Sequence, residues 1–143
     1  MFQVDFPPHN FRLKKENNKH LIFDEVRRLW VTLTPEEWVR QNFLQYLILV
    51  KKYPASLISV EKIIKVGELK KRYDIVVYNN NNPWMIVECK KNNTTINTAV
   101  IEQVIRYNLA LSIKYFIVTN GNQNFAYEVS ENLFRELNEL PEL

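Results

Sequence analysis

Length, composition and charge limit the kinds of protein that this chain can be. It has 143 residues, of which 46% are hydrophobic and 24% charged, and its formal net charge is +3. These values predict one soluble domain, residues 1–143, which is long enough to bury a sizeable core. The single cysteine, Cys89, excludes an internal disulfide and a CxxC zinc site. His9 and His20 are too few and too poorly placed for a histidine metal site or a Ser-His triad.

Two further classes are excluded by the distribution of glycine and of apolar residues. Neither Gly67 nor Gly121 belongs to a GxxxxGK[ST] sequence, so the chain is not itself an ATP-driven translocase. The uncharged run in its most apolar helix, residues 42–50, is far too short to span a bilayer, and residues 1–11 lack a signal-peptide pattern. We therefore expect a cytoplasmic protein without membrane partners, whose positive charge permits a polyanionic ligand.

The amino-terminal region has the pattern of a small hairpin. Residues 11–15 and 20–23 flank the turn-forming pair Asn17-Asn18, and residues 28–33 read as a further strand or an extended entry. No chemistry is evident in this stretch. We expect residues 1–33 to be an extension that covers one edge of a larger sheet.

A helix follows with a clear start signal. Thr34 is placed as N-cap, Pro35 occupies the first helical position, and Glu37 lies three residues after the cap. The apolar residues that follow recur with helical spacing to about Val50 and predict a buried face: Trp38, Val39, Phe43, Leu44, Leu47 and Ile48. The Tyr53-Pro54 pair ends the helix.

Residues 57–66 are rich in isoleucine and valine and predict a strand, joined to the next one through residues 67–69. Glu61 on this strand is expected to face solvent. The edge around it is basic, because it carries Lys62, Lys65, Lys70, Lys71 and Arg72. Such cations suit phosphate contacts without sequence reading. A solvated strand edge that is protected from aggregation is the alternative interpretation.

The central stretch predicts a β-hairpin with a polar end. Residues 73–78 and 84–89 have strand composition, and residues 79–83 form turns. Because side chains alternate along a strand, Glu88 and Lys90 share one face and lie ~6.6 Å apart.

The register of the two strands decides whether the polar end of the hairpin forms a functional site. Asp74 lies on the first strand, on the face of Val76, and correct pairing would bring it beside Glu88. Burial of two carboxylates next to apolar neighbours is unfavourable unless a cation compensates. Mg²⁺ suits this role, since it takes one or two carboxylates and keeps several waters. The backbone carbonyl of Cys89 could supply a third oxygen, and Lys90 could hold or deprotonate a water on the metal.

The alternative is a solvated hairpin in which Glu88 and Lys90 form an ordinary ion pair of little energetic value. Against it stands the uncharged run of residues 83–87 that directly precedes them. A charged pair at the end of a core strand indicates a function.

The remainder of the chain predicts a helix, two strands and a final helix. After a polar loop, residues 97–111 form a helix with an apolar side made of Val100, Ile101, Val104 and Leu111. Residues 114–119 form a strand, and a helix between two strands favours a parallel crossover. Residues 125–129 are a last short strand, and residues 131–140 a helix with Leu133, Phe134 and Leu137 inward.

Several of these residues carry a family resemblance. Asp74, thirteen intervening residues and then Glu88-Cys89-Lys90 resemble the PD-(D/E)xK nuclease motif, with Tyr73 in place of its proline. The chain is more closely similar to the amino-terminal nuclease domain of type I restriction enzyme R subunits. The similarity is carried by short strings in order: TLTPEEWVRQ at 32–41, YP at 53–54, VEK at 60–62, KRYDIVVY at 71–78, VECKK at 87–91, QVIRYN at 103–108 and VTNG at 118–121.

This resemblance implies an α/β fold of restriction-endonuclease type, with an αβββαβ core in residues 34–143. It implies DNA cleavage with Mg²⁺ or Mn²⁺, in which a glutamate of the first helix reaches the metal. Glu36 is preferred, since Val39 and Phe43 share its stripe, whereas capping and the helix dipole account for Glu37.

The resemblance also covers the second helix. Gln103 and Tyr107 are similar to the Gln-xxx-Tyr element of RecB-like nucleases, which borders the active site. The expected DNA contacts are Lys71, Arg72, Lys91 and Arg106. The implied partners are DNA and other restriction–modification subunits, namely motor, methyltransferase and specificity subunits. The alternatives are a catalytically silent DNA-binding or subunit-docking module of the same fold, and a purely structural scaffold.

Overall fold

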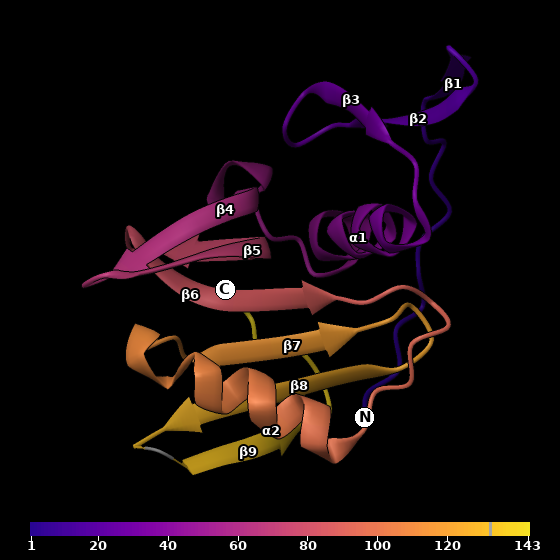
Figure 1. Ribbon diagram of the computed structural model, residues 1–143. Helices are drawn as coiled ribbons and strands as arrows, with labels where there is room; N and C mark the ends of the chain where they lie inside the picture. Colours follow the sequence, from indigo (N-terminus) through magenta and orange to yellow (C-terminus); the bar gives the residue numbers. More distant parts are fainter. Residues whose placement is uncertain (132) are drawn as a thin grey trace.

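The structure, a computed structural model, describes residues 1–131 and 133–143 and has the expected α/β fold (Figure 1). The amino-terminal strands are β1 (Leu13–Glu16), β2 (Lys19–Asp24) and β3 (Leu29–Thr32). The main sheet is built from β4 (Ile58–Val66), β5 (Leu69–Asn79), β6 (Asn82–Cys89), β7 (Tyr115–Thr119), β8 (Asn124–Ser130) and β9 (Leu133–Leu137). The helices are α1 (Pro35–Gln45) and α2 (Thr98–Tyr107), with short helical turns at Tyr46–Val50, Ala55–Leu57 and Leu109–Leu111.

The main sheet has its six strands in chain order, from β4 at one edge to β9 at the other. Neighbouring strands pair antiparallel except β6 and β7, which are parallel and connected by α2. This confirms the predicted hairpin and the predicted crossover. The polar turn at Asn80 and Asn81 has positive φ at both residues, which asparagine tolerates better than most side chains.

Each face of the sheet is covered by one helix, and each has its own hydrophobic core. Phe43, Leu44 and Leu47 of the first helical segment pack against one face, while Ile101 and Ile105 of α2 pack against the other. Figure 1 shows α2 lying across β7, β8 and β9 and α1 lying beyond the end of β4 and β5. Trp38, expected on the buried face of α1, is instead 43% exposed and packs its ring on Phe11.

The small sheet β1-β2-β3 lies on the far side of α1 from β6 (Figure 1). Its Ile22 and Asp24 are fully buried, and Asp24 accepts a hydrogen bond of 2.9 Å from Gln41 of α1. Residues 28–33 contain the expected further strand. The extension contacts the main sheet: the Phe2 N–H donates to the Asn124 carbonyl of β8, and Val26 and Arg27 of the β2–β3 turn line a surface hollow with β4.

The predicted carboxy-terminal helix at residues 131–140 is wrong, although residue 132 in that range lies outside the described residues. Residues 133–137 form strand β9, which pairs antiparallel with β8. Phe134 and Leu137 are three apart, and in a strand this spacing places them on opposite faces, where each packs on a different core. The same spacing in a helix would have put them together. The predicted helix at 97–111 also ends earlier, at Tyr107.

Candidate active site

Asp74 lies at an interruption of the sheet. The regular pairs of β4 with β5 include Val60 with Ile75 and Lys62 with Tyr73 but skip Asp74, and the pairs of β5 with β6 begin at Ile75. The Cys89 N–H of β6 donates to Asp74 Oδ2 at 2.9 Å. Irregular pairing of this kind re-aims side chains and is common beside functional sites.

This irregularity corrects one detail of the expected hairpin. Tyr73 and Val76 both pack in the α2-side core although they are three residues apart, so alternation is broken between them. Asp74 does not simply share the face of Val76, because its Oδ1 accepts a hydrogen bond of 3.0 Å from Arg40 of α1. Burial raises the pKa of the Asp74 carboxyl, against the lowering effects of the Cys89 N–H and the Arg40 charge.

Glu88, near the end of β6, is a buried carboxylate whose negative charge is only weakly balanced by nearby cations and hydrogen-bond donors. Its side chain is 14% exposed, and Lys71 Nζ lies 4.0 Å from its Oε1. Within the described part of the chain, Glu88 Oε1 is buried without a hydrogen-bond partner. Burial, followed by the negative charge of Asp74, raises the pKa of Glu88 to about 7, although Lys71 and Lys90 act in the opposite direction.

Four other side chains of interest surround Glu88. A pocket of about 250 Å³ is lined by Glu88 together with Lys71, Lys90, Gln103 and Tyr107, and by two apolar residues of α2. The Lys71 ammonium lies 4.5 Å from the centre of the Tyr107 ring. The structure thus brings Glu88 and Lys90, at the carboxyl end of β6, into one pocket with Gln103 and Tyr107 of α2. A loop separates these two pairs of residues in the sequence.

The two glutamates of α1 have different surroundings. Thr34 Oγ1 accepts from the Glu37 N–H at 3.0 Å, as its predicted N-cap role requires. The Glu37 carboxylate is buried and accepts two hydrogen bonds from Arg40. Glu36 is exposed, and burial and the Asp74 charge raise its pKa while Arg40 and Lys90 oppose the rise. The pKa of the Glu36 carboxyl thus responds to Asp74 and Lys90, whereas the Glu37 carboxylate is paired with Arg40.

Arg40 is the residue that the sequence interpretation missed. It is almost fully buried and donates to carboxylates on three elements: Glu37 on α1, Glu61 on β4 and Asp74 on β5. A signal existed, because Arg40 lies between Val39 and Phe43 in the buried part of the helix, where an unpaired charge is rare.

The expectation that Glu61 faces solvent holds in part, since 30% of its side chain is exposed. Its carboxylate accepts from Arg40 at 2.5 Å and from Arg72 at 3.4 Å. Its φ of 56° lies in the left-handed region, where a residue other than glycine is strained. Glu61 lies opposite Asp74, where the regular pairing of β4 with β5 is interrupted. The pairing of β5 with β6 also leaves out Asp74.

Comparison with known proteins gives one family match. A family model described as "Type I restriction enzyme R protein N terminus (HSDR_N)" matches residues 35–141. The chain belongs to this family. No curated protein and no solved structure matches it. The match runs from α1 through β9, so it contains all the pocket residues and leaves out the small sheet.

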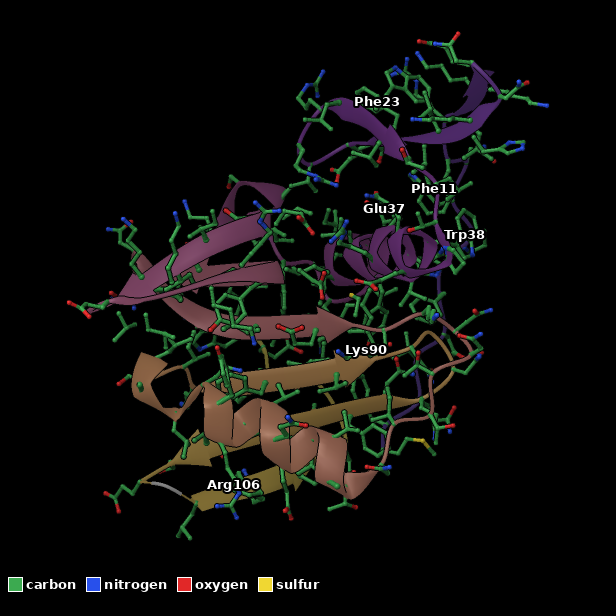
Figure 2. All side chains as sticks on the ribbon, in the orientation of Figure 1. Phe11, Phe23, Glu37, Trp38, Lys90 and Arg106 are labelled. Atoms are coloured by element: carbon green, nitrogen blue, oxygen red, sulfur yellow. The ribbon has the colours of Figure 1, made fainter. Side chains whose placement is uncertain are left out.

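In this R-protein-family chain, the residues expected to contact DNA occupy different places. Lys71 lines the pocket, Lys91 is exposed just after β6, and Arg72 has 62% of its side chain exposed while contacting Glu61. Arg106 lines a neighbouring surface hollow with Gln103 and Tyr107, and Figure 2 shows it well away from Lys90. The first three are close to the Asp74–Glu88 end of the hairpin in sequence and register, whereas Arg106 lies in the adjoining hollow, which shares Gln103 and Tyr107 with the pocket.

The donor set of this R-protein-family chain fits a hard divalent cation. Glu88 Oε1 is the buried acceptor without a partner, and each Asp74 oxygen accepts one hydrogen bond and keeps a further lone pair. Among residues 1–131 and 133–143, no group of three His, Cys, Asp or Glu side chains is arranged around one metal position. Mg²⁺ does not require such a group, since one or two carboxylates suffice. In the same described residues, no helix is long and apolar enough to cross a membrane.

Proposed function

We propose that this chain is a metal-dependent DNA endonuclease of the PD-(D/E)xK type that acts in type I restriction or a related DNA defence. The observation that carries the proposal is the buried Glu88 Oε1 without a hydrogen-bond partner among the described residues, in a pocket shared with Lys90. Membership of the R protein N-terminal family supports the restriction context.

The charges around Glu88 support a role in phosphodiester hydrolysis. Asp74 and Glu88 would hold Mg²⁺ or Mn²⁺, with the Cys89 carbonyl as a third oxygen ligand. When bound, the ion would activate water and offset the charge of the transition state. Lys90 would orient the attacking water and stabilise the negative charge that develops on the phosphoryl oxygens. Burial favours this chemistry, because electrostatic interactions are stronger where water is excluded.

The helices would complete the site from both sides. Gln103 and Tyr107 line the pocket that also contains Lys90. They would orient the Lys90 ammonium or contact the nucleic acid. Glu36 would act from α1, because its pKa responds to both Asp74 and Lys90. Lys71, Arg72, Lys91 and Arg106 would contact phosphates without reading sequence.

The proposed partners follow from what residues 1–143 contain. They include no GxxxxGK[ST] sequence, so ATP-dependent movement along DNA is assigned to a motor outside these residues. Methyltransferase and specificity subunits are the other proposed partners, in keeping with the family.

Plasmid cleavage tests the proposal. We expect the purified chain to nick or linearise plasmid DNA with Mg²⁺ or Mn²⁺ and to lose this activity in EDTA. Lys90→Ala should reduce the rate by about 10²–10³-fold, since it removes a cation that stabilises the transition state. Lys114→Ala removes an exposed lysine before β7 and serves as the matched control, with unchanged cleavage expected. Cleavage that survives both EDTA and Lys90→Ala would refute the assignment.

A second candidate function is a catalytically silent DNA-binding or docking module. It is favoured by the ion pair of Arg40 with Asp74, which already supplies a positive charge to this carboxylate. This alternative predicts salt-dependent DNA binding without cleavage at any divalent metal concentration. A purely structural scaffold would show neither DNA binding nor DNA cleavage.

A further inference from the structure

The small amino-terminal sheet presents a basic face to solvent. In its register, Lys14 pairs with Leu21, and Phe23 pairs with Trp30, so these side chains lie on one face together with Arg12. The opposite face carries the fully buried Ile22 and Asp24, and Asp24 accepts a hydrogen bond from Gln41 of α1. The small sheet therefore has one face that is buried in part and one face on which Arg12, Lys14 and Lys19 are exposed.

Cations on the exposed face are fixed on aromatic rings. The Arg12 guanidinium lies 4.4 Å from the centre of the Phe23 ring and 5.4 Å from that of Trp30. The Lys14 ammonium lies 4.4 Å from the Trp30 ring, and the two rings pack edge to face at 5.4 Å. These contacts restrict long, flexible side chains, so less conformational entropy remains to be lost when they bind an anion.

The same contacts determine what kind of anion fits. Because the rings of Phe23 and Trp30 are covered by cations, they are not free to stack on exposed bases, as single-strand binding requires. The face also carries Lys19, which pairs with Glu16 across the β1–β2 turn, and Glu16 contacts Lys14 at 3.0 Å. Three cations against one carboxylate leave an excess of positive charge suited to a phosphate backbone.

This face is separate from the pocket. Residues 12–30 lie outside the part of the chain that matches the R protein family. Figure 2 shows Phe23 on the small sheet, beyond Glu37 and α1 and well away from Lys90. Its positive charge therefore cannot be explained by the needs of the cleavage site.

We propose that the exposed face of the small sheet, with Arg12, Lys14 and Lys19, is a second DNA contact that binds the phosphate backbone of a duplex without reading its sequence. The choice of duplex DNA as ligand rests on the proposed function. The contact itself requires neither a metal nor cleavage, so binding and catalysis can be tested separately.

The test is the salt dependence of binding to a fluorescein-labelled DNA duplex, measured by anisotropy in EDTA. The variant R12Q/K19Q removes two positive charges and retains Lys14 on Trp30. Each lost phosphate contact should reduce the slope of log K against log [salt] by about 0.9, so we expect a decrease of about 1.8 and, at moderate salt, roughly tenfold weaker binding. K52Q/K114Q removes the same charge from other exposed positions and should leave the slope unchanged.

The outcomes separate this proposal from the cleavage proposal. An unchanged slope in R12Q/K19Q, or an equal loss in K52Q/K114Q, would overturn the second contact even if the chain cleaves plasmid. A selective loss in a chain that never cleaves DNA would support the contact and refute only the nuclease function. Circular-dichroism melting should show that both variants remain folded, and a tighter preference for single-stranded over duplex DNA would also count against the proposal.

Discussion

At the level of single residues, Glu88 carries an electrostatic conflict that the fold tolerates. Its pKa is raised from 4.5 to about 7, first by burial and then by Asp74. An acid whose pKa is higher in the folded than in the unfolded state binds protons more tightly when folded. Stability from this group therefore decreases as the pH rises from about 4.5 to about 7, and the full penalty is present above pH 7.

Glu88→Gln should relieve this penalty. In EDTA at pH 8 we expect the variant to unfold at a higher denaturant concentration, with a gain on the order of 3 kcal/mol from the size of the pKa shift. At pH 5, where the folded wild-type carboxyl is already protonated, the gain should fall below roughly 1 kcal/mol. Urea unfolding at both pH values measures this difference.

The matched control is Glu142→Gln, because the Glu142 side chain is 90% exposed and its contact with Lys51 is long, at 3.6 Å. It should leave stability unchanged at both pH values. A Glu88→Gln variant that is less stable than the wild type at pH 8 would show that this carboxylate is well compensated in solution.

At the level of elements, Arg40 connects α1 to the interrupted strands. Its guanidinium bridges Glu37, Glu61 and Asp74, which belong to α1, β4 and β5. The strained φ of Glu61 lies in the same network, so this kink is maintained where the arginine holds its carboxylate. The network thus fixes the position of the helix relative to Asp74.

Arg40→Gln should be strongly destabilising. It leaves three carboxylates around a site that has lost its main cation, and breaking a buried ion pair from one side costs about 3–5 kcal/mol. Chemical denaturation at pH 7 measures the loss. Arg135→Gln is the control, since Arg135 pairs with Glu128 on an exposed surface, where such a pair contributes about 0–1 kcal/mol. Equal losses in the two variants would mean that Arg40 has no special structural role.

At the level of the whole molecule, the first 33 residues contact both the main sheet, at β8, and helix α1. The Phe2 N–H donates to the Asn124 carbonyl of β8, and the Phe2 side chain is buried in the core that α1 covers. The small sheet is attached elsewhere, through the hydrogen bond of Gln41 to Asp24 and the contact of Arg27 with Glu37. The extension therefore contributes to the core as well as to the surface.

Removal of residues 1–33 should impair folding of the remainder. Loss of Phe2 alone should cost about 3–5 kcal/mol, a large fraction of the stability of a typical domain. We expect chain 34–143 to show no cooperative thermal transition by near-UV circular dichroism. Removal of residues 142–143, whose side chains are exposed, should leave the transition intact. A cooperative 34–143 fragment of wild-type stability would show that the extension is independent.

Local patterns in the sequence were sufficient for most elements and for part of the site. The Thr34 cap, the Asn-rich hairpin turn and the helix between two apolar strands each depend on neighbouring residues, and the structure has all three. Alternation along β6 likewise located Glu88 and Lys90 at one pocket. Residues 133–137 were misread because their apolar spacing fits either a helix or a strand shared between two cores.

What the sequence by itself determined is therefore the identity and order of most elements and the grouping of Glu88 with Lys90, which depend on local periodicity. Only the tertiary structure decided that Arg40 joins Asp74 and Glu61, that the Glu37 carboxylate pairs with Arg40, and that residues 133–137 complete the sheet. These outcomes depend on charges and strand edges brought together from distant parts of the chain, where burial makes pairing obligatory. Such long-range requirements leave no periodic signal in the sequence.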